Sequence, residues 1–376
     1  KKKVLYSILI VLLAGMAGGA IYINTLLPVI TGYAAKNLAS AVFISGRSQA
    51  GVEALDLNFS VIKYTTNEVD TIRKKVTSRF LWGKSTAIYR EGFGCTIVHG
   101  SDEAALHEVR FPIVTRAVPI QDSLEWPLGN RIPLRIISGT DLAKLQEISA
   151  GLIEKDAYNG HAFAIMVVHK GYPSVERYQP EFNQKTRFLS WSMAKSFTNA
   201  LAGIMVKDGK MDIHKPVDIP EWQNDDRKNI TINNLLQMQS GLKWNEDYGS
   251  GSDVNLMLHR ESDFAAYVAD HPSKSAPGTE WYYSSGSTNL VTGLIRRVVN
   301  DDEQYYRLAP EQLFNRIGMP DAVFEVDASG TLVGSSYVYA TARDYARFAL
   351  LYLQDGIFNG ERILPEGWVK YTTTPA

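Results

Sequence analysis

The stretch Phe188–Phe197, FLSWSMAKSF, places a serine three residues before a lysine. Apolar residues at helical spacing continue from it to Met205, so the pattern predicts a helix over about 192–207. Positions i and i+3 share a helix face, which puts the side chains of Ser192 and Lys195 next to each other. The first turn of a helix offers unpaired backbone N–H groups and the positive end of the dipole, and both favour developing negative charge there.

A serine hydroxyl becomes a strong nucleophile only when a base takes its proton. A lysine can be that base once desolvation or a nearby cation favours its neutral form. An S-x-x-K spacing alone is weak evidence, because such pairs also occur on solvated helix faces. Here Ser192, Lys195 and Asn199 share one side of an otherwise apolar segment, which favours a site over a solvated face. Asn199 is therefore a candidate substrate-binding residue.

Composition excludes several function classes. The chain has 376 residues, room for one large domain with appendages or for two domains. Its 39 Lys and Arg against 40 Asp and Glu give no general attraction to nucleic acid, so no nucleic-acid partner is predicted. The single cysteine, Cys95, excludes an internal disulfide, and no His or Cys cluster has metal-ligand spacing. We therefore predict no metal and no other cofactor.

The N-terminus predicts a membrane segment. Lys1–Lys3 precedes Val4–Ile23, twenty residues without a charge, which is enough to cross ~30 Å of hydrocarbon as a helix. A cleaved signal peptide, with small residues at 17–20 as the processing site, is the alternative. We favour an uncleaved anchor because the apolar run exceeds a usual signal-peptide core. With the lysines in the cytoplasm, the chain is a single-pass inner-membrane protein whose remaining part lies on the periplasmic side.

Two glycines bear on assembly. Gly15 and Gly19 form a GxxxG pair, the pattern that lets two membrane helices pack closely. A homo-oligomer is therefore one open alternative, and glycines that are merely tolerated in a membrane helix are the other.

The rest of the chain divides by composition. We predict a membrane anchor or signal segment over 1–30, a small β-rich region ending in a Pro-rich linker over 31–135, and a main domain over 136–376. Within the β-rich region, the patterns predict a short helix over Tyr33–Val42 and strands over Leu55–Tyr64, Thr71–Trp82 and Ser85–Tyr89, with a turn at Gly83-Lys84.

The main domain mixes helices and strands, which indicates an α+β or α/β enzyme. A helix over Asp141–Lys155 precedes a hairpin over 162–178, and the Ser192 helix follows. Later helices are predicted over Ile230–Met238, Ser262–Ala269, Ser287–Val299, Ala309–Arg316 and Ala342–Gln354.

The loop 243–252, KWNEDYGSGS, combines aromatic, acidic and glycine residues. This composition is typical of a binding loop at the rim of a pocket, and Trp244 and Tyr248 are its candidate substrate-binding residues. A solvated surface loop has the same composition, and both interpretations stay open.

A second motif lies at 277–286, PGTEWYYSSG. A tyrosine near a lysine can move a proton, because its hydroxyl both donates and accepts. Together with the SMAK of 192–195 and the ITINNLLQMQSGL of 230–242, this segment resembles the serine hydrolases of the class C β-lactamase and penicillin-binding-protein superfamily. Within it, Ala194–Phe197 and the loop 245–248 are most similar to the 6-aminohexanoate-dimer hydrolases and related esterases. The resemblance covers about 141–372.

The resemblance implies a β-lactamase/transpeptidase-like α+β fold, in which an antiparallel sheet is flanked by helices and joined to a helical subdomain. It implies that Ser192 is acylated by a small ester or amide, that Lys195 is its base, and that Tyr283 protonates the leaving group and activates the deacylating water. Tyr248 matches a tyrosine that contacts substrate. Ser285 stands where the family usually has asparagine, so its contact with Lys195 or substrate is in question.

The resemblance also implies a third motif, a basic residue or histidine followed by a small residue and glycine, on a strand that supplies an oxyanion N–H. No segment of the sequence fits it, and we expect the sequence to be an incomplete copy of a longer protein. Two alternatives stay open: a D-Ala-D-Ala carboxypeptidase or β-lactamase, and a catalytically silent binding protein on the hydrolase fold.

Overall fold

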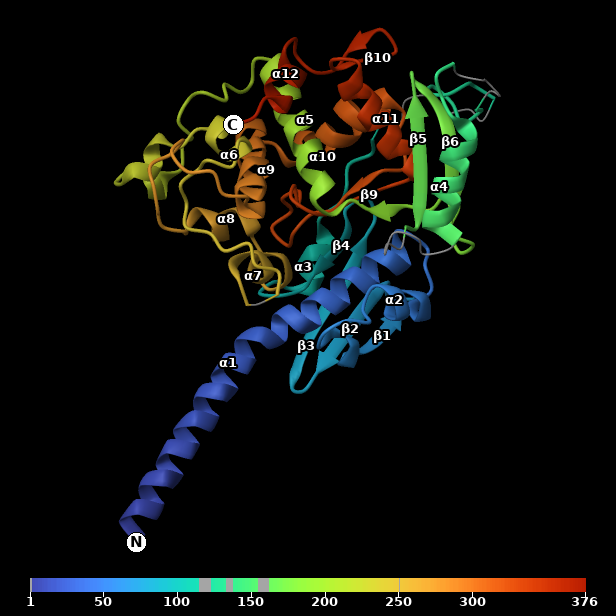
Figure 1. Cartoon of the computed structure of the whole chain (residues 1–376). Coiled ribbons are helices and arrows are strands. Elements are labelled where there is room, and N and C mark those ends of the chain that lie inside the picture. The colour runs from blue at the N-terminus through green and yellow to red at the C-terminus, as the bar shows by residue number, and fades with distance from the viewer. Residues whose placement is uncertain (1, 115–122, 133–137, 155–161, 250) are drawn as a thin grey trace. The chain divides into compact units, whose positions relative to one another are not determined.

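The computed structural model describes residues 2–114, 123–132, 138–154, 162–249 and 251–376 (Figure 1). Their contacts group the chain into two compact units. The first consists of Lys1–Val109, Lys243–His271 and Val326–Thr331, and the second of Arg110–Leu242, Pro272–Glu325 and Leu332–Ala376. The predicted main domain over 136–376 stays a prediction, because two of its stretches group with the N-terminal residues.

The first unit begins with a single helix, α1 (Lys2–Phe43). The helix predicted over Tyr33–Val42 is confirmed, but it is the last part of α1 and not a separate element, since the helix continues through Pro28 without a break. Proline removes one backbone hydrogen bond from a helix, and here the packing of the following turns compensates, with Leu27, Ala34 and Leu38 at most 1% exposed. By length and composition alone, the stretch Ile10–Phe43 is apolar enough to cross a membrane.

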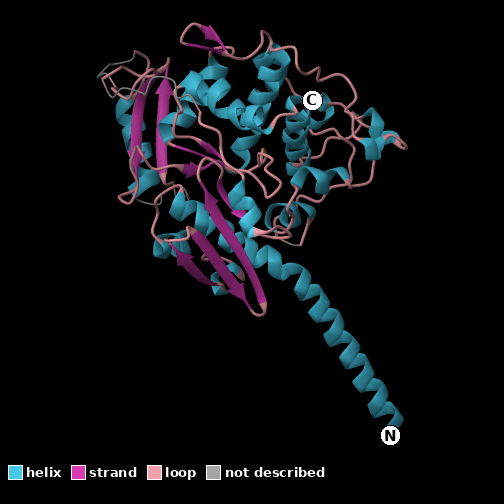
Figure 2. Cartoon of the chain, turned by 180° about the vertical axis from the view of Figure 1, so that it is seen from behind, coloured by secondary structure: helices cyan, strands magenta, loops and turns pink. Residues whose placement is uncertain are grey.

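An antiparallel sheet packs against the second half of α1 (Figures 1 and 2). Its strands follow chain order: β1 (Thr66–Asp70), β2 (Lys75–Phe80), β3 (Gly83–Arg90) and β4 (Gly94–Ile97). The predicted turn at Gly83-Lys84 lies two residues earlier, at Leu81-Trp82.

The strand predicted over Leu55–Tyr64 is wrong. Only its first residue, Leu55, lies in a helix, α2 (Gln49–Leu55); turns follow, and the stretch ends in the short 3₁₀ helix η1 (Ile62–Tyr64). Ser48 accepts a hydrogen bond from the backbone N–H of Gly51 and so caps α2, a local signal that the alternation of apolar residues concealed.

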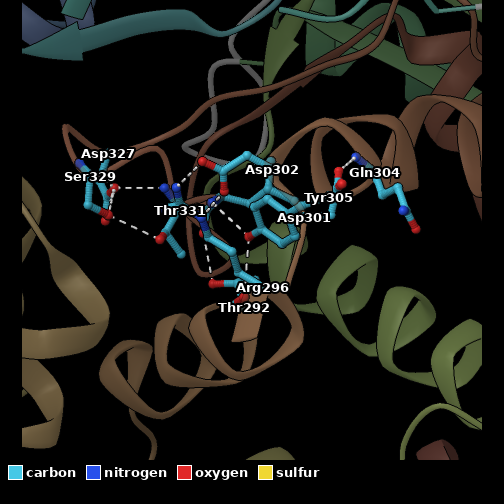
Figure 3. Close-up of polar contacts among 10 residues, drawn as sticks. Thr292, Arg296, Asp301, Asp302, Gln304, Tyr305, Asp327, Ser329 and Thr331 are labelled. Carbon is cyan, nitrogen blue, oxygen red and sulfur yellow. Dashed lines mark hydrogen bonds and ion pairs between the residues drawn. The ribbon is translucent and has the colours of Figure 1, made fainter. Parts of the chain in front are cut away.

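The first unit also holds α3 (Glu103–Glu108), α7 (Asp253–His259) and α8 (Phe264–Ala269). Asp327 fastens α8, because its buried carboxylate accepts from the backbone N–H of Phe264 at 3.0 Å. The same carboxylate accepts from the N–H and hydroxyl of Ser329 and from the N–H of Thr331 (Figure 3). Burial raises the pKa of Asp327 to about 6.

The second unit carries short antiparallel sheets flanked by helices, so the predicted α+β class is confirmed. The strands pair as β5 (Ala164–His169) with β6 (Tyr172–Tyr178), as β7 (Phe188–Leu189), β9 (Val338–Ala340) and β8 (Val323–Phe324) in that order, and as β10 (Ile357–Phe358) with β11 (Glu361–Arg362). The described helices are α4 (Leu142–Glu154), α5 (Ala194–Lys207), α6 (Ile232–Leu236), α9 (Ser285–Val299), α10 (Asp302–Arg307), α11 (Ala342–Leu353) and α12 (Trp368–Thr373), with 3₁₀ turns η3 (Trp191–Met193), η4 (Pro220–Trp222) and η5 (Asp226–Asn229).

Helices α5 and α9 form the middle of this unit. Phe197 on α5 is fully buried and stacks on Phe348 of α11, with ring centres 3.9 Å apart. Tyr305 of α10 donates to the carbonyl of Thr292 on α9, and Arg296 of α9 pairs with Asp302 (Figure 3). These contacts hold the two helices that position the candidate site.

The α-helix predicted over Ala309–Arg316 is irregular. The chain forms a π-helix, η6 (Leu308–Phe314), followed by a 3₁₀ turn, η7 (Asn315–Ile317). Pro310 lies inside the π-helix and has no N–H to donate, so a regular α-helical ladder is broken there.

Candidate active site

Ser192 lies on the 3₁₀ turn η3, directly before α5, and its side chain is exposed. Lys195 is half-buried one turn later, and its Nζ lies 3.2 Å from the Ser192 hydroxyl oxygen. The two side chains therefore share a face, as the i, i+3 spacing predicts. A nucleophile and a base need this hydrogen-bonding distance to exchange a proton.

The backbone immediately before Ser192 is strained. Trp191 has φ of +44°, a left-handed conformation that costs a non-glycine residue about 1–2 kcal/mol. Ser190 holds it there: its hydroxyl donates to the carbonyl of Ser336 and accepts from the N–H of Val338, and its own N–H donates to the Val338 carbonyl. Contacts with the chain leading into β9 thus set the direction in which Ser192 leaves the turn.

Lys195 is surrounded by oxygen atoms. Its Nζ lies 3.1 Å from the Ser285 hydroxyl and 3.1 Å from the carbonyl oxygen of Ser335. Ser285 is fully buried at the first position of α9, which Ser284 caps by accepting from the N–H of Ser287. The serine that replaces the family's asparagine therefore does reach Lys195.

Tyr283 meets Lys195 with the face of its ring, whose centre lies 4.8 Å from Nζ. The loop that carries it is fixed at its neighbours, since the N–H of Tyr282 donates to the carbonyl of Met238 and that of Ser284 contacts the Met238 sulfur. An aromatic face stabilises a lysine cation. The proton-shuttle role of the Tyr283 hydroxyl stays a prediction.

No pattern in the sequence predicts the contact between Lys195 and Ser335. Ser335 is fully buried and is held by Asn289 of α9, whose amide donates to its hydroxyl at 2.9 Å and accepts from its N–H at 3.3 Å. Gly334 precedes it, and a Cβ there would come within 2.4 Å of the Thr198 hydroxyl oxygen. The one signal in the sequence that could have indicated this contact is the run of small residues Gly334-Ser335-Ser336, shortly before the apolar strand β9.

Asn199 shares the helix face of Ser192 and Lys195, but its contacts are structural. Its side-chain carbonyl accepts from the hydroxyl of Tyr352 on α11, from the indole N–H of Trp368 on α12, and from the hydroxyl of Thr372. Asn199 thus joins α5 to two other helices, and its predicted part in substrate binding stays a prediction.

Trp244 and Tyr248 belong to the first unit. Both donate to the carboxylate of Glu246, Trp244 through its indole N–H and Tyr248 through its hydroxyl at 2.6 Å. Trp244 is 8% exposed and Tyr248 is 55% exposed. The loop is thus ordered by its own side chains, and its part in substrate binding stays a prediction.

The described residues contain no group of three or more His, Cys, Asp or Glu side chains that could hold a metal ion.

Comparison with known proteins identifies the class. The family model described as Beta-lactamase matches residues 150–376, more than half of the chain, so the chain belongs to the beta-lactamase family. This confirms the resemblance drawn from the three motifs. Proteins of this family are serine hydrolases.

Individual proteins are similar to parts of this chain. The 6-aminohexanoate-dimer hydrolase of Paenarthrobacter ureafaciens is 25% identical over 295 residues, which cover 70% of this chain and 75% of that protein. A structure of a putative 6-aminohexanoate-dimer hydrolase from Bacillus anthracis is 27% identical with a TM-score of 0.49, and the match covers 55% of this chain and 58% of that one. A putative beta-lactamase from Bacteroides dorei is 20% identical with a TM-score of 0.50 over 61% of this chain and 68% of that one, which supports the fold alone.

Proposed function

We propose that this protein is a membrane-anchored serine hydrolase that cleaves an ester or a small linear amide through an acyl-enzyme on Ser192. The observation that carries the proposal is the 3.2 Å approach of Lys195 Nζ to the Ser192 hydroxyl on an exposed helix start. In this scheme, the Ser192 oxygen attacks the substrate carbonyl while Lys195 takes its proton, and the Ser192 N–H stabilises the oxyanion.

The surroundings of Lys195 support its part as a base. A neutral amine has two hydrogens and one lone pair. The oxygens of Ser285 and Ser335, each 3.1 Å from Nζ, can accept both hydrogens, and the lone pair is then free to face the Ser192 hydroxyl. Tyr283, beside the same amine, protonates the leaving group and later activates the water that releases the acyl group.

The substrate class rests on the relative named for hydrolysis of the 6-aminohexanoate dimer, a linear amide, at 25% identity. The cellular location rests on α1: with Lys1–Lys3 in the cytoplasm, its apolar run would hold the catalytic residues on the periplasmic side of the inner membrane.

Labelling with a fluorophosphonate probe tests the nucleophile. We expect the full-length protein to be labelled and Ser192→Ala to be unlabelled. Ser196→Ala is the matched control, because Ser196 is an exposed serine four residues later, on α5, and the variant should label normally. Absence of labelling of the unmodified protein would favour a binding protein on the hydrolase fold.

A substrate panel then tests the bond that is cleaved. We expect hydrolysis of p-nitrophenyl esters and of the linear 6-aminohexanoate dimer to exceed that of nitrocefin and of a D-Ala-D-Ala peptide. The reverse order would replace the proposed esterase or amidase with a β-lactamase or carboxypeptidase.

A further inference from the structure

The turn between β2 and β3 carries two large apolar side chains in solvent. Leu81 and Trp82 are 65% and 60% exposed, and Leu81 has φ of +51°. Two-residue hairpin turns usually hold Gly, Asn or Asp, which accept a positive φ and are polar. Burial in the fold does not explain a leucine and a tryptophan at these two exposed positions, so their chemistry points to a surface outside the protein.

This turn lies beside α1, near the point where the helix extends beyond the sheet (Figures 1 and 2). The indole N–H of Trp82 donates to the side-chain oxygen of Asn24 at 3.3 Å. A Cβ at Gly83 would come within 2.6 Å of Leu27, so the strand start lies directly against the helix. Large apolar side chains on α1 are exposed up to Ile23, whereas Leu27 is 1% exposed.

The turn therefore lies next to the position on α1, between Ile23 and Leu27, where the helix changes from exposed to buried. The apolar run Val4–Ile23 has the length that spans the hydrocarbon of a bilayer, which leaves Asn24 at the boundary between hydrocarbon and headgroups. Trp82, bonded to Asn24, lies at the same level. Tryptophan is enriched at this boundary because its ring is apolar while its N–H needs a polar partner.

Two cations lie directly behind the turn. Arg79 and Lys84 are cross-strand partners on β2 and β3, and both are exposed. Arg79 also pairs with Glu68 at 3.2 Å. Basic side chains next to an apolar tip match the phosphate groups of lipids above an acyl-chain layer.

We propose that Leu81 and Trp82 insert into the headgroup layer of a phospholipid bilayer and form a second membrane contact beside α1. The inference rests on the membrane attachment proposed above and is independent of the proposed hydrolysis. A single helix leaves a domain free to rotate and tilt above the membrane, whereas two contacts fix its orientation. The first unit would therefore hold a defined face toward the lipid.

The test places an environment-sensitive fluorophore on single cysteines of the full-length protein in vesicles of phosphatidylethanolamine and phosphatidylglycerol. Cys95→Ala, at a fully buried position, removes the native thiol. Trp82→Cys reports on the proposed contact. Ile72→Cys is the matched control, because Ile72 is 93% exposed in the turn at the opposite end of β2, about 20 Å away for a six-residue strand.

We expect the label at 82 to show blue-shifted emission, strong quenching by lipids with a shallow spin label, and several-fold weaker quenching by iodide than the label at 72. Neutralising Arg79 and Lys84 to glutamine should bring iodide quenching at 82 closer to that at 72. Equal emission and equal iodide quenching at the two positions would overturn the proposal. Shielding of position 82 from iodide without quenching by the shallow spin-labelled lipid would also overturn it, since a protein partner would then cover the turn.

A third label separates this inference from the anchor itself. Met16→Cys lies at an exposed position within the apolar run, and lipids with a deep spin label should quench it. Quenching of the label at 16 without lipid contact at 82 would rule out the hairpin contact and would still support α1 as a membrane anchor. Loss of both would remove the anchor and the hairpin contact together, while fluorophosphonate labelling of Ser192 would still report on the hydrolase.

Discussion

Lys195 Nζ lies 4.8 Å from the centre of the Tyr283 ring, so the tyrosine approaches the lysine with its face. This geometry separates two roles that a tyrosine can have. The ring stabilises a cation, which opposes the action of Lys195 as a base, whereas the hydroxyl can carry a proton to the leaving group. The two roles predict different results for two substitutions.

Tyr283→Phe keeps the ring and removes the hydroxyl, and we expect turnover of a p-nitrophenyl ester to fall by ~10²–10⁴, the usual contribution of general acid–base catalysis. Tyr283→Leu should lose as much. Tyr282→Phe, at a 43% exposed position in the same loop, should keep normal turnover. Normal turnover in Tyr283→Phe with loss in Tyr283→Leu would assign the ring, and not the hydroxyl, to the reaction.

Lys195→Ala and Lys195→Arg test the base. Arginine keeps the positive charge but is not deprotonated in proteins, so a base role predicts that both variants lose ~10²–10⁴ in kcat. Lys207→Ala is the control on the same helix, because Lys207 contacts the carbonyl of Arg362 and should leave kcat unchanged. Thermal unfolding checks that each variant folds. Retained activity in Lys195→Arg would show that Lys195 acts only through its positive charge and not as a base.

Asn199→Ala should lower stability without changing the kinetics of the folded enzyme. The substitution leaves the hydroxyl of Thr372 and the indole N–H of Trp368 without the acceptor that they share, which costs about 1–3 kcal/mol. The hydroxyl of Tyr352 keeps the carbonyl of Ser196, at 3.3 Å, as its acceptor. Asn199→Asp keeps an oxygen acceptor and should recover most of the loss. Urea unfolding measures the stability, and a raised KM in a folded Asn199→Ala would restore its predicted place in substrate binding.

Two buried groups of the first unit give opposite pH dependences. Burial raises the pKa of Asp327 from 3.8 to about 6, so below pH 6 the folded state holds a proton that the unfolded state releases above pH 3.8. Stability from this group therefore falls as the pH rises from about 4 to 6. Burial, with nearby Lys36, lowers the pKa of His259 from 6.5 to about 3. Because the folded state then excludes a proton that the unfolded state binds, stability from His259 rises over the same range.

The contributions of these two groups to the unfolding free energy should cancel each other between about pH 4 and 6 in the unmodified protein. His259→Gln should expose the Asp327 slope, with stability falling as the pH rises, and Asp327→Asn should expose the opposite slope. Urea unfolding across this range measures both. The slopes are compared and not the absolute stabilities, because each substitution also changes packing. Identical slopes in the two variants would contradict the assignment.

The sequence predicted what is local in the chain. The Ser192–Lys195 contact follows from three-residue spacing on a helix, and strands β2 and β3 follow from alternation in a continuous segment. The support of Lys195 by Ser335 joins residues 140 positions apart, and no local pattern encodes such a contact. The continuation of α1 through Pro28 depends likewise on packing against a sheet, which periodicity alone does not show.

The hydrogen bonds that hold Ser190 limit how this site could be transferred to another protein. The helix α5 carries the Ser–Lys spacing, yet the backbone that aims the serine is held by Ser336 and Val338, which lie about 150 residues later in the sequence. If the SMAK helix alone were grafted onto another scaffold, Ser192 and Lys195 would keep their spacing. The orientation of Ser192 would be lost, because Trp191 would relax to negative φ. The smallest unit that could be transferred to another protein is α5 together with the segment of Ser336 and Val338 that enters β9.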